Sequence, residues 1–207
     1  MFLRFTMMFM SLCVVFVCAS DASGKAPVPR KDAFFGIHFD IHANPNDQAI
    51  GSETTEENIE KLIARTRPDF ITYDCKGHPG HVSYPTRFGN AVPGIVNDSL
   101  AIWREVTRRH GVGLYIHYSG VIDRLAVDKK PEWGAIKADG SLDNKTTSVF
   151  SPYADKLMIP QLKEAIDRYD LDGIWIDGDN WGVVWDYSPA ALEAWQRETG
   201  LSEAPRS

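Results

Sequence analysis

An apolar run that ends in an acid is the strongest chemical signal in the chain. Residues 172–177 read Asp-Gly-Ile-Trp-Ile-Asp, and Gly178 follows. A carboxylate at the C-terminal end of a barrel strand faces the substrate mouth, where glycosidases place their nucleophile. We therefore expect Asp177 to be a catalytic nucleophile. Asp177 could instead cap the turn before Gly178, and Asp179 could take its role, whereas Asp172 is expected to be structural.

Aromatic and histidine side chains after the predicted strands suit a sugar ligand. A flat apolar ring can stack on a pyranose while nearby polar groups bond the sugar hydroxyls. Trp133 and Trp181 lie in such loops, and His117 lies near the end of a predicted strand. His117 could equally have a structural role. These residues favour a carbohydrate substrate. Hydrolysis of a glycosidic bond needs no cofactor.

Three alternating residues near the N-terminus offer a different chemistry. His38, Asp40 and His42 share one face of a strand if the two-residue period holds. They resemble the His-x-His of metal-dependent amidohydrolase barrels, which recruit further histidine and aspartate ligands from later strands. Metal-dependent hydrolysis is therefore the alternative enzymatic function.

Short strands alternate with helices along the chain, which indicates an α/β fold with parallel strands and right-handed crossovers. An open doubly wound sheet is disfavoured because no glycine-rich phosphate turn follows the first strand. Residues 119–150 read as a long irregular stretch. The predicted strands span 34–40, 70–73, 112–117 and 173–176, and the predicted helices begin after Thr54, Asp98, Ser151 (with a bend at Pro160) and Ser188.

The chain is too short for a whole barrel. It has 207 residues, whereas a closed (β/α)8 TIM barrel usually needs about 250. We therefore expect a partial barrel of about four βα units, which needs a partner chain or a missing C-terminal half to close it. A non-catalytic carbohydrate-binding fragment is a further alternative.

The N-terminus has the pattern of a secretory signal. Arg4 precedes an apolar run over residues 5–17, and small residues follow. We predict a signal peptide over 1–20, a linker over 21–31 and a glycosidase-like barrel segment over 32–207, which is secreted or periplasmic with no membrane attachment after the leader is removed. Only Cys75 lies outside the leader, so we expect a buried thiol and no internal disulfide. The net charge of -6 argues against a nucleic-acid partner.

Three motifs, in order, resemble the α-L-fucosidases of glycoside hydrolase family 29. Residues 32–37 (Asp-Ala-Phe-Phe-Gly-Ile) are similar to the family's first strand, which leads to a sugar-binding histidine. Residues 76–81 (Lys-Gly-His-Pro-Gly-His) are similar to its Lys-His-His-Asp-Gly turn, and residues 172–178 to its nucleophile strand. The resemblance implies the N-terminal half of the barrel. It also implies a retaining reaction in which Asp177 attacks the anomeric carbon, with an acid/base carboxylate from a later strand about 5 Å away.

The chain departs from the family at two of these motifs. Asp40 falls where the first-strand histidine would be, and Gly77, Pro79 and Gly80 separate the histidines of the second motif. A broader similarity is to uncharacterised glycosidase-like barrels related to the family, so the sugar stays open. The residues expected to contact substrate are His38, Asp40, His42, Lys76, His78, His81, His117, Trp133, Asp179 and Trp181.

Overall fold

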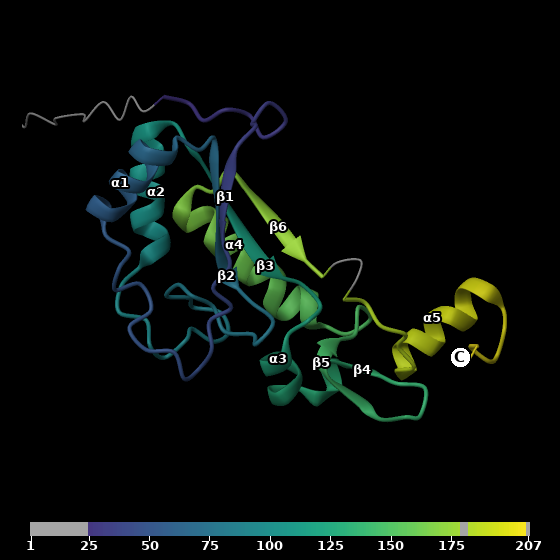
Figure 1. Cartoon of the computed structure of the whole chain (residues 1–207). Coiled ribbons are helices and arrows are strands. Elements are labelled where there is room, and N and C mark those ends of the chain that lie inside the picture. Colours follow the sequence, from purple (N-terminus) through teal and green to yellow (C-terminus); the bar gives the residue numbers. More distant parts are fainter. Residues whose placement is uncertain (1–24, 179–181, 206–207) are drawn as a thin grey trace, which may run out of the picture.

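A parallel sheet of four strands forms the centre of the computed structural model, which describes residues 25–178 and 182–205 (Figure 1). The spatial order is β1 (Gly36–Phe39), β2 (Phe70–Lys76), β3 (Gly113–Ser119) and β6 (Gly173–Asp177). Every neighbouring pair is parallel, which confirms the predicted topology. The strands overlap the four predicted ones: β1 is shorter at both ends, and β2, β3 and β6 extend further toward their C-terminal ends.

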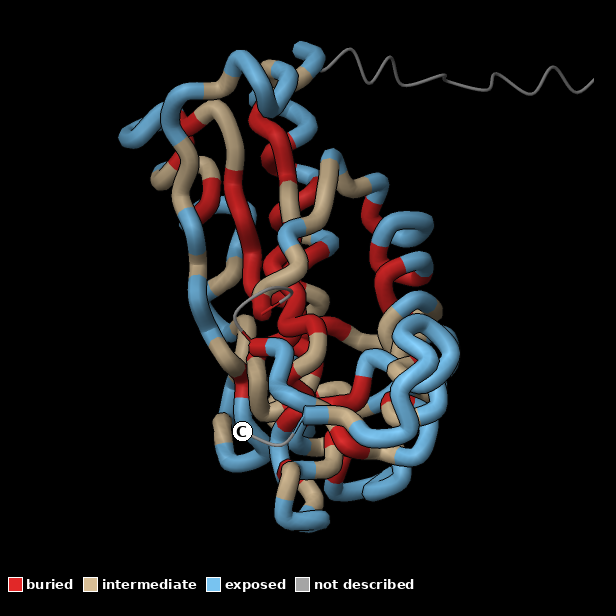
Figure 2. Tube along the Cα trace, turned by 90° about the vertical axis from the view of Figure 1, so that its right-hand side faces the viewer, coloured by how far each residue is buried: buried red, intermediate tan, exposed pale blue. Residues whose placement is uncertain are grey.

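Three helices cover one face of this sheet: α1 (Glu56–Thr66), α2 (Ser99–His110) and α4 (Ile159–Tyr169). Alternate strand residues such as Ile71 and Leu114 pack with the helices in one apolar cluster, seen as the buried strand segments of Figure 2. Cys75 belongs to this cluster and is fully buried as a free thiol, as predicted. No helix of the described residues covers the opposite face of the sheet, and Trp175 on it is 51% exposed.

The helix ends follow local sequence signals. Asp98 accepts a hydrogen bond from the backbone N–H of Ala101, and Gly111 ends α2 in the left-handed region, as predicted. At α1 the predicted cap is wrong by one residue. Thr55, rather than Thr54, accepts from the backbone N–H of Asn58.

The segment predicted to be irregular contains regular structure. It forms α3 (Arg124–Lys129), a 3-10 turn over Pro131–Trp133, and the antiparallel hairpin of β4 (Gly134–Ile136) and β5 (Leu142–Thr147). Asp123 caps α3 by accepting from the backbone N–H of Ala126. β5 is polar (Leu-Asp-Asn-Lys-Thr-Thr), so hydrophobic periodicity could not reveal it.

The helix before β6 changes its winding near the predicted bend. A π-helical turn over Ala154–Met158 precedes α4, and the N–H of Ile159 donates to the carbonyl of Ala154. Pro160 follows directly and has no N–H to continue the α-helical pattern. Where the sequence predicted a bend at Pro160, the structure thus has a π-helical turn that ends just before this proline.

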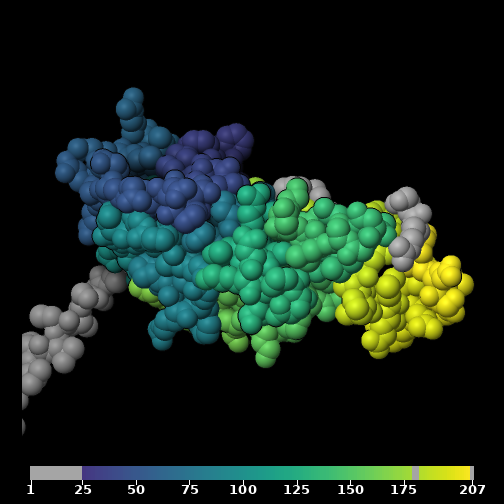
Figure 3. Space-filling model, turned by 90° about the horizontal axis from the view of Figure 1, so that it is seen from below, coloured from purple at the N-terminus to yellow at the C-terminus, as the bar shows by residue number. Residues whose placement is uncertain are grey.

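The last helix, α5 (Pro189–Thr199), lies beyond the end of the sheet, beside the hairpin (Figure 1). In the space-filling view it forms a lobe at one end of the molecule (Figure 3). Ser188 caps α5 and Gly200 ends it, as predicted. Among the described residues no helix is long and apolar enough to cross a membrane, and the predicted leader lies outside the described ranges.

Candidate active site

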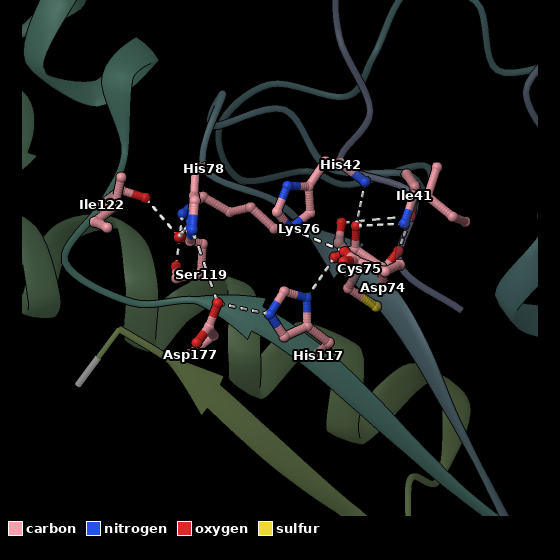
Figure 4. Close-up of polar contacts among 12 residues, drawn as sticks. Ile41, His42, Asp74, Cys75, Lys76, His78, His117, Ser119, Ile122 and Asp177 are labelled. Carbon is pink, nitrogen blue, oxygen red and sulfur yellow. Dashed lines mark hydrogen bonds and ion pairs between the residues drawn. The ribbon is translucent and has the colours of Figure 1, made fainter. Parts of the chain in front are cut away.

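The carboxyl ends of the four parallel strands bring the candidate residues together (Figure 4). In the sheet register Asp74 of β2 is level with His117 of β3, and Ser119 of β3 is level with Asp177 of β6. His42 enters from the loop after β1. This is the edge at which barrel enzymes build their active sites.

Asp177 is enclosed but accessible. Its side chain is 16% exposed, and its Oδ2 lies 3.3 Å from Nε2 of His117 and 3.8 Å from Nε2 of His78. Gly178 follows with φ +78°, a left-handed conformation that suits glycine. The carboxylate therefore contacts imidazole rings at the mouth of the sheet and keeps a face toward solvent.

His117 lies between two carboxylates. The residue is 2% exposed, and its Nδ1 lies 2.8 Å from Oδ1 of Asp74. Burial lowers the pKa of His117, but the hydrogen bonds and charges of Asp74 and Asp177 outweigh it, so this pKa is raised above its usual value. The ring is thus held on both sides by acids.

The orientation of His78 is fixed by a serine. Ser119 Oγ donates to the carbonyl of Ile122, at 2.6 Å, so its lone pairs accept from Nδ1–H of His78, at 2.7 Å. Nε2 of His78 then faces Asp177. Burial and the neighbouring His42 lower the pKa of His78, and Asp177 opposes that change.

The three alternating residues of β1 and its loop separate in the structure. Nε2 of His42 lies 3.0 Å from Oδ1 of Asp40, and the ring of His42 stacks on His117 with the centroids 5.7 Å apart. His38 instead packs edge-on against the rings of His117 and Trp175, each with centroids 5.3 Å away. His38 and His42 therefore approach the ring of His117 in different ways, one edge-on and one stacked.

Four side chains, two from the loop after β1 and one each from β2 and β3, could hold a metal ion. One donor atom each from Asp40, His42, Asp74 and His117 lie within 4.8 Å of one another. The group contains two residues of the predicted metal set, Asp40 and His42, whereas His38 is not among its members. Two imidazoles and two carboxylates are a donor set that zinc accepts.

Lys76, expected to contact substrate, lies in the interior. Its side chain is fully buried, and Nζ lies 2.8 Å from Oδ2 of Asp123 and 4.4 Å from the centroid of the Tyr118 ring. The β2–β3 register shifts between Asp74 and Lys76, so the alternation that places Asp74 at the site does not continue to Lys76. We assign Lys76 a structural role.

The structure places one of two further candidates, His81, beside His78, and it places the other, Trp133, against Tyr153. His81 and His78 both line a cavity of about 770 Å³, together with Arg124 and Lys145, and Nδ1 of His81 is buried without a hydrogen-bond partner among the described residues. Trp133 packs edge-on against Tyr153, with the centroids 6.1 Å apart. The candidates Asp179 and Trp181 lie outside the described residues.

Asp74 is the functional residue that the sequence interpretation missed. It is 1% exposed and binds both His117 and the backbone of the β1 loop. The signal was present, because Thr72 and Asp74 alternate with the apolar Ile71, Tyr73 and Cys75 at the end of a strand.

The fold resembles solved α-L-fucosidases. α-L-Fucosidase isoenzyme 2 from Paenibacillus thiaminolyticus superposes with a TM-score of 0.68 at 22% identity, over 82% of this chain and 26% of that protein. The α-L-fucosidase AlfC, solved in complex with Fucα(1,6)GlcNAc, gives a TM-score of 0.53 at 15% identity, over 79% of this chain and 63% of that protein. No protein-family model matches the sequence, and no curated protein matches it either.

The match thus spans about a quarter of the first of these proteins and under two thirds of the second. The four parallel strands and their helices have the fold of part of an α-L-fucosidase barrel.

Proposed function

We propose that this chain forms the nucleophile-bearing part of a retaining glycoside hydrolase of the α-L-fucosidase type. The observation that carries the proposal is the position of Asp177, at the carboxyl end of β6 and in contact with His117 and His78. The similarity to an α-L-fucosidase fold supports the choice of a fucoside as the first substrate to test.

The proposed reaction has two steps. A carboxylate oxygen of Asp177 attacks the anomeric carbon while the glycosidic C–O bond breaks, and an acid group gives its proton to the departing oxygen. Water then attacks the glycosyl ester, the same group takes back a proton, and the sugar leaves with Asp177 restored. His78 lies beside Asp177, and His38 and His42 pack on His117, so these three histidines would bond the sugar hydroxyls.

The acid/base carboxylate belongs, in this proposal, to a part of the barrel that these residues do not form. β1 and β6 each have only one neighbour in the described sheet, whereas every strand of a closed barrel has two. The missing strands would come from a longer polypeptide or from a partner chain.

A substrate that needs no acid tests the nucleophile in the chain as it stands. Fluoride leaves without protonation, so α-L-fucosyl fluoride should transfer its fucosyl group to Asp177. Mass spectrometry of the intact chain and of its peptides should find one fucosyl residue, carried on Asp177. Asp177→Asn should give no adduct, whereas Asp139→Asn, in the exposed hairpin turn, should react like the original chain.

A separate measurement of L-fucose binding to the chain distinguishes the remaining outcomes. L-Fucose bound without any adduct would favour the non-catalytic carbohydrate-binding alternative, whereas an adduct on another residue would remove Asp177 from the mechanism. Neither binding nor adduct, tested also with other glycosyl fluorides, would overturn the proposal.

Metal-dependent hydrolysis is the second candidate, favoured by the proximity of Asp40, His42, Asp74 and His117. Metal analysis of the purified chain after dialysis against zinc tests it. One zinc per chain, lost in His42→Ala and kept in His110→Ala, would favour this candidate. Sugar binding that is insensitive to chelators would favour the glycosidase.

Export is the third part of the proposal and rests on Arg4 and the apolar run over residues 5–17. Expression of the whole chain in a bacterium should release a product that lacks the first twenty or so residues. Mass spectrometry of the exported product measures the cleavage site.

A further inference from the structure

We infer that Asp74 is a positioning residue that orients both His117 and the His42 loop around the proposed nucleophile. The inference rests on the proposed role of Asp177, because positioning has a purpose only if that carboxylate reacts. Asp74 contacts Asp177 through His117 rather than directly (Figure 4).

The Asp74 carboxylate accepts hydrogen bonds from three donors. Oδ1 accepts from Nδ1 of His117, and Oδ2 accepts from the backbone N–H groups of Ile41 and His42. An ionised carboxylate only accepts hydrogen bonds, so it requires a proton on each of these nitrogens. At 1% exposure no bulk water competes for its oxygens.

The first contact sets the direction of the His117 ring. With Nδ1 committed to Asp74, Nε2 is the ring atom that faces Asp177. The rings of His38 and Trp175, with centroids 5.3 and 5.0 Å from that of His117, limit its tilt. Asp74, His117 and Asp177 therefore form a line across three neighbouring strands.

The second contact holds the loop after β1. His42 has φ +47°, in the left-handed region that is unfavourable for a non-glycine residue. The two N–H bonds to Asp74 help to hold it there. The His42 ring then lies between His117 and His78, with centroids 5.7 and 4.9 Å away.

Gly77 shows how closely this loop is packed. A Cβ at position 77 would lie 2.7 Å from Cα of His42 and 2.7 Å from atoms of its ring. The glycine that separates Lys76 from His78 thus leaves room for the backbone and ring of His42. Asp74 thus holds the His117 ring directly and the His42 loop through two backbone hydrogen bonds.

The first experiment measures the ring nitrogens of His117 by NMR with ¹⁵N-labelled histidine, at a single near-neutral pH. We expect a proton on Nδ1, shifted downfield by its carboxylate partner. Asp74→Asn should lose this signal, and Asp172→Asn should keep it. Asp172 is the matched control because it also accepts a backbone N–H, that of Leu114, but at the opposite end of the strands. An unprotonated Nδ1 in the unmodified chain, or an unchanged signal in Asp74→Asn, would overturn the inference.

The second experiment measures the rate of fucosyl transfer from α-L-fucosyl fluoride to Asp177. Asp74→Asn should slow transfer by about 100-fold, the loss that a misplacement of 1 Å can cause. In Asp74→Asn the concentration of α-L-fucosyl fluoride that gives the half-maximal rate should change little. Asp172→Asn should react at the normal rate. A normal rate in folded Asp74→Asn would contradict the inference, whereas failure of the unmodified chain to form an adduct would contradict the proposed function and leave the NMR result to decide the positioning.

Discussion

Nζ of Lys76 lies 2.8 Å from Oδ2 of Asp123, and neither side chain is more than 1% exposed. The same amine also donates to the carbonyl of Ser119 and to the hydroxyl of Tyr153. This pair joins the end of β2 to the start of α3. It therefore ties α3, which precedes the β4–β5 hairpin, to the sheet beside Ser119 of the candidate site.

Removal of one partner of this pair should be costly. Lys76→Met should lower the free energy of unfolding by about 3–5 kcal/mol, because it leaves the Asp123 carboxylate buried without its cation. Adding Asp123→Asn should restore part of that loss. The control is Lys61→Met, whose partner Glu57 is exposed, and which should cost less than about 1 kcal/mol. Urea unfolding measures all three, and equal losses in the two single variants would contradict the assignment.

Loss of the serine behind His78 should weaken sugar binding. Ser119→Ala removes the acceptor of His78 Nδ1–H, so the ring loses the contact that directs Nε2 toward Asp177. A neutral hydrogen bond contributes about 0.5–1.5 kcal/mol, so the affinity for L-fucose should fall by about 2- to 13-fold. Calorimetry measures the affinity, with Ser141→Ala in the hairpin turn as the control. An unchanged affinity would show that His78 does not need Ser119.

Alkaline pH should destabilise the fold through buried tyrosines. Burial raises the pKa of Tyr84 above its usual value of 10, and the residue is 1% exposed. The unfolded chain therefore loses this proton at lower pH than the folded one. The stability that depends on it is complete below pH 10 and falls as the pH rises further, by up to about 1.4 kcal/mol per pH unit.

Tyr84→Phe should reduce this pH dependence. Urea unfolding at about pH 9 and about pH 11 measures it in both proteins. The same loss of stability in Tyr84→Phe as in the original chain would assign the effect to other groups.

Asp186 should control the attachment of α5 to the hairpin. Its carboxylate accepts from the backbone N–H of Ile136 and of Ser188 and from the hydroxyl of Ser148. Asp186→Ala should accelerate hydrogen exchange at the Ile136 amide, because its acceptor is lost. Asp155→Ala, an exposed acid on the π-helical turn, should leave this exchange unchanged. Full protection of Ile136 in Asp186→Ala would show that other contacts hold the hairpin.

Local signals predicted the frame of the molecule and the position of Asp177. Each strand of the parallel sheet contains an apolar run, α1, α2, α3 and α5 start at an acid or hydroxyl cap, and α2 and α5 end at a glycine, so neighbours in the sequence suffice to find most of these elements. Asp177 was identifiable because an acid ends a strand. The hairpin was not, because the polar β5 is defined by its pairing with β4 rather than by its own composition.

The details of the site depend on contacts between distant residues. The register shift in β2 separates the roles of Asp74 and Lys76, although residues two positions apart on a strand ordinarily share a face. His38 and His42 likewise separate because His42 turns into the loop, where Asp74 binds its backbone. Neither event has a signature within a few residues, so alternation alone predicted a different arrangement.

The strand order places β1 and β6 at opposite margins of the sheet, each with one row of backbone groups that no described strand pairs. Any polypeptide that completes the cylinder has to reach both margins at once, since a single added strand would satisfy one side and leave the other bare. In the proposed barrel, closure would therefore be a cooperative event. Asp177 lies on β6, at one of these two margins. The geometry around it therefore depends more than the rest of the site on whether the barrel closes.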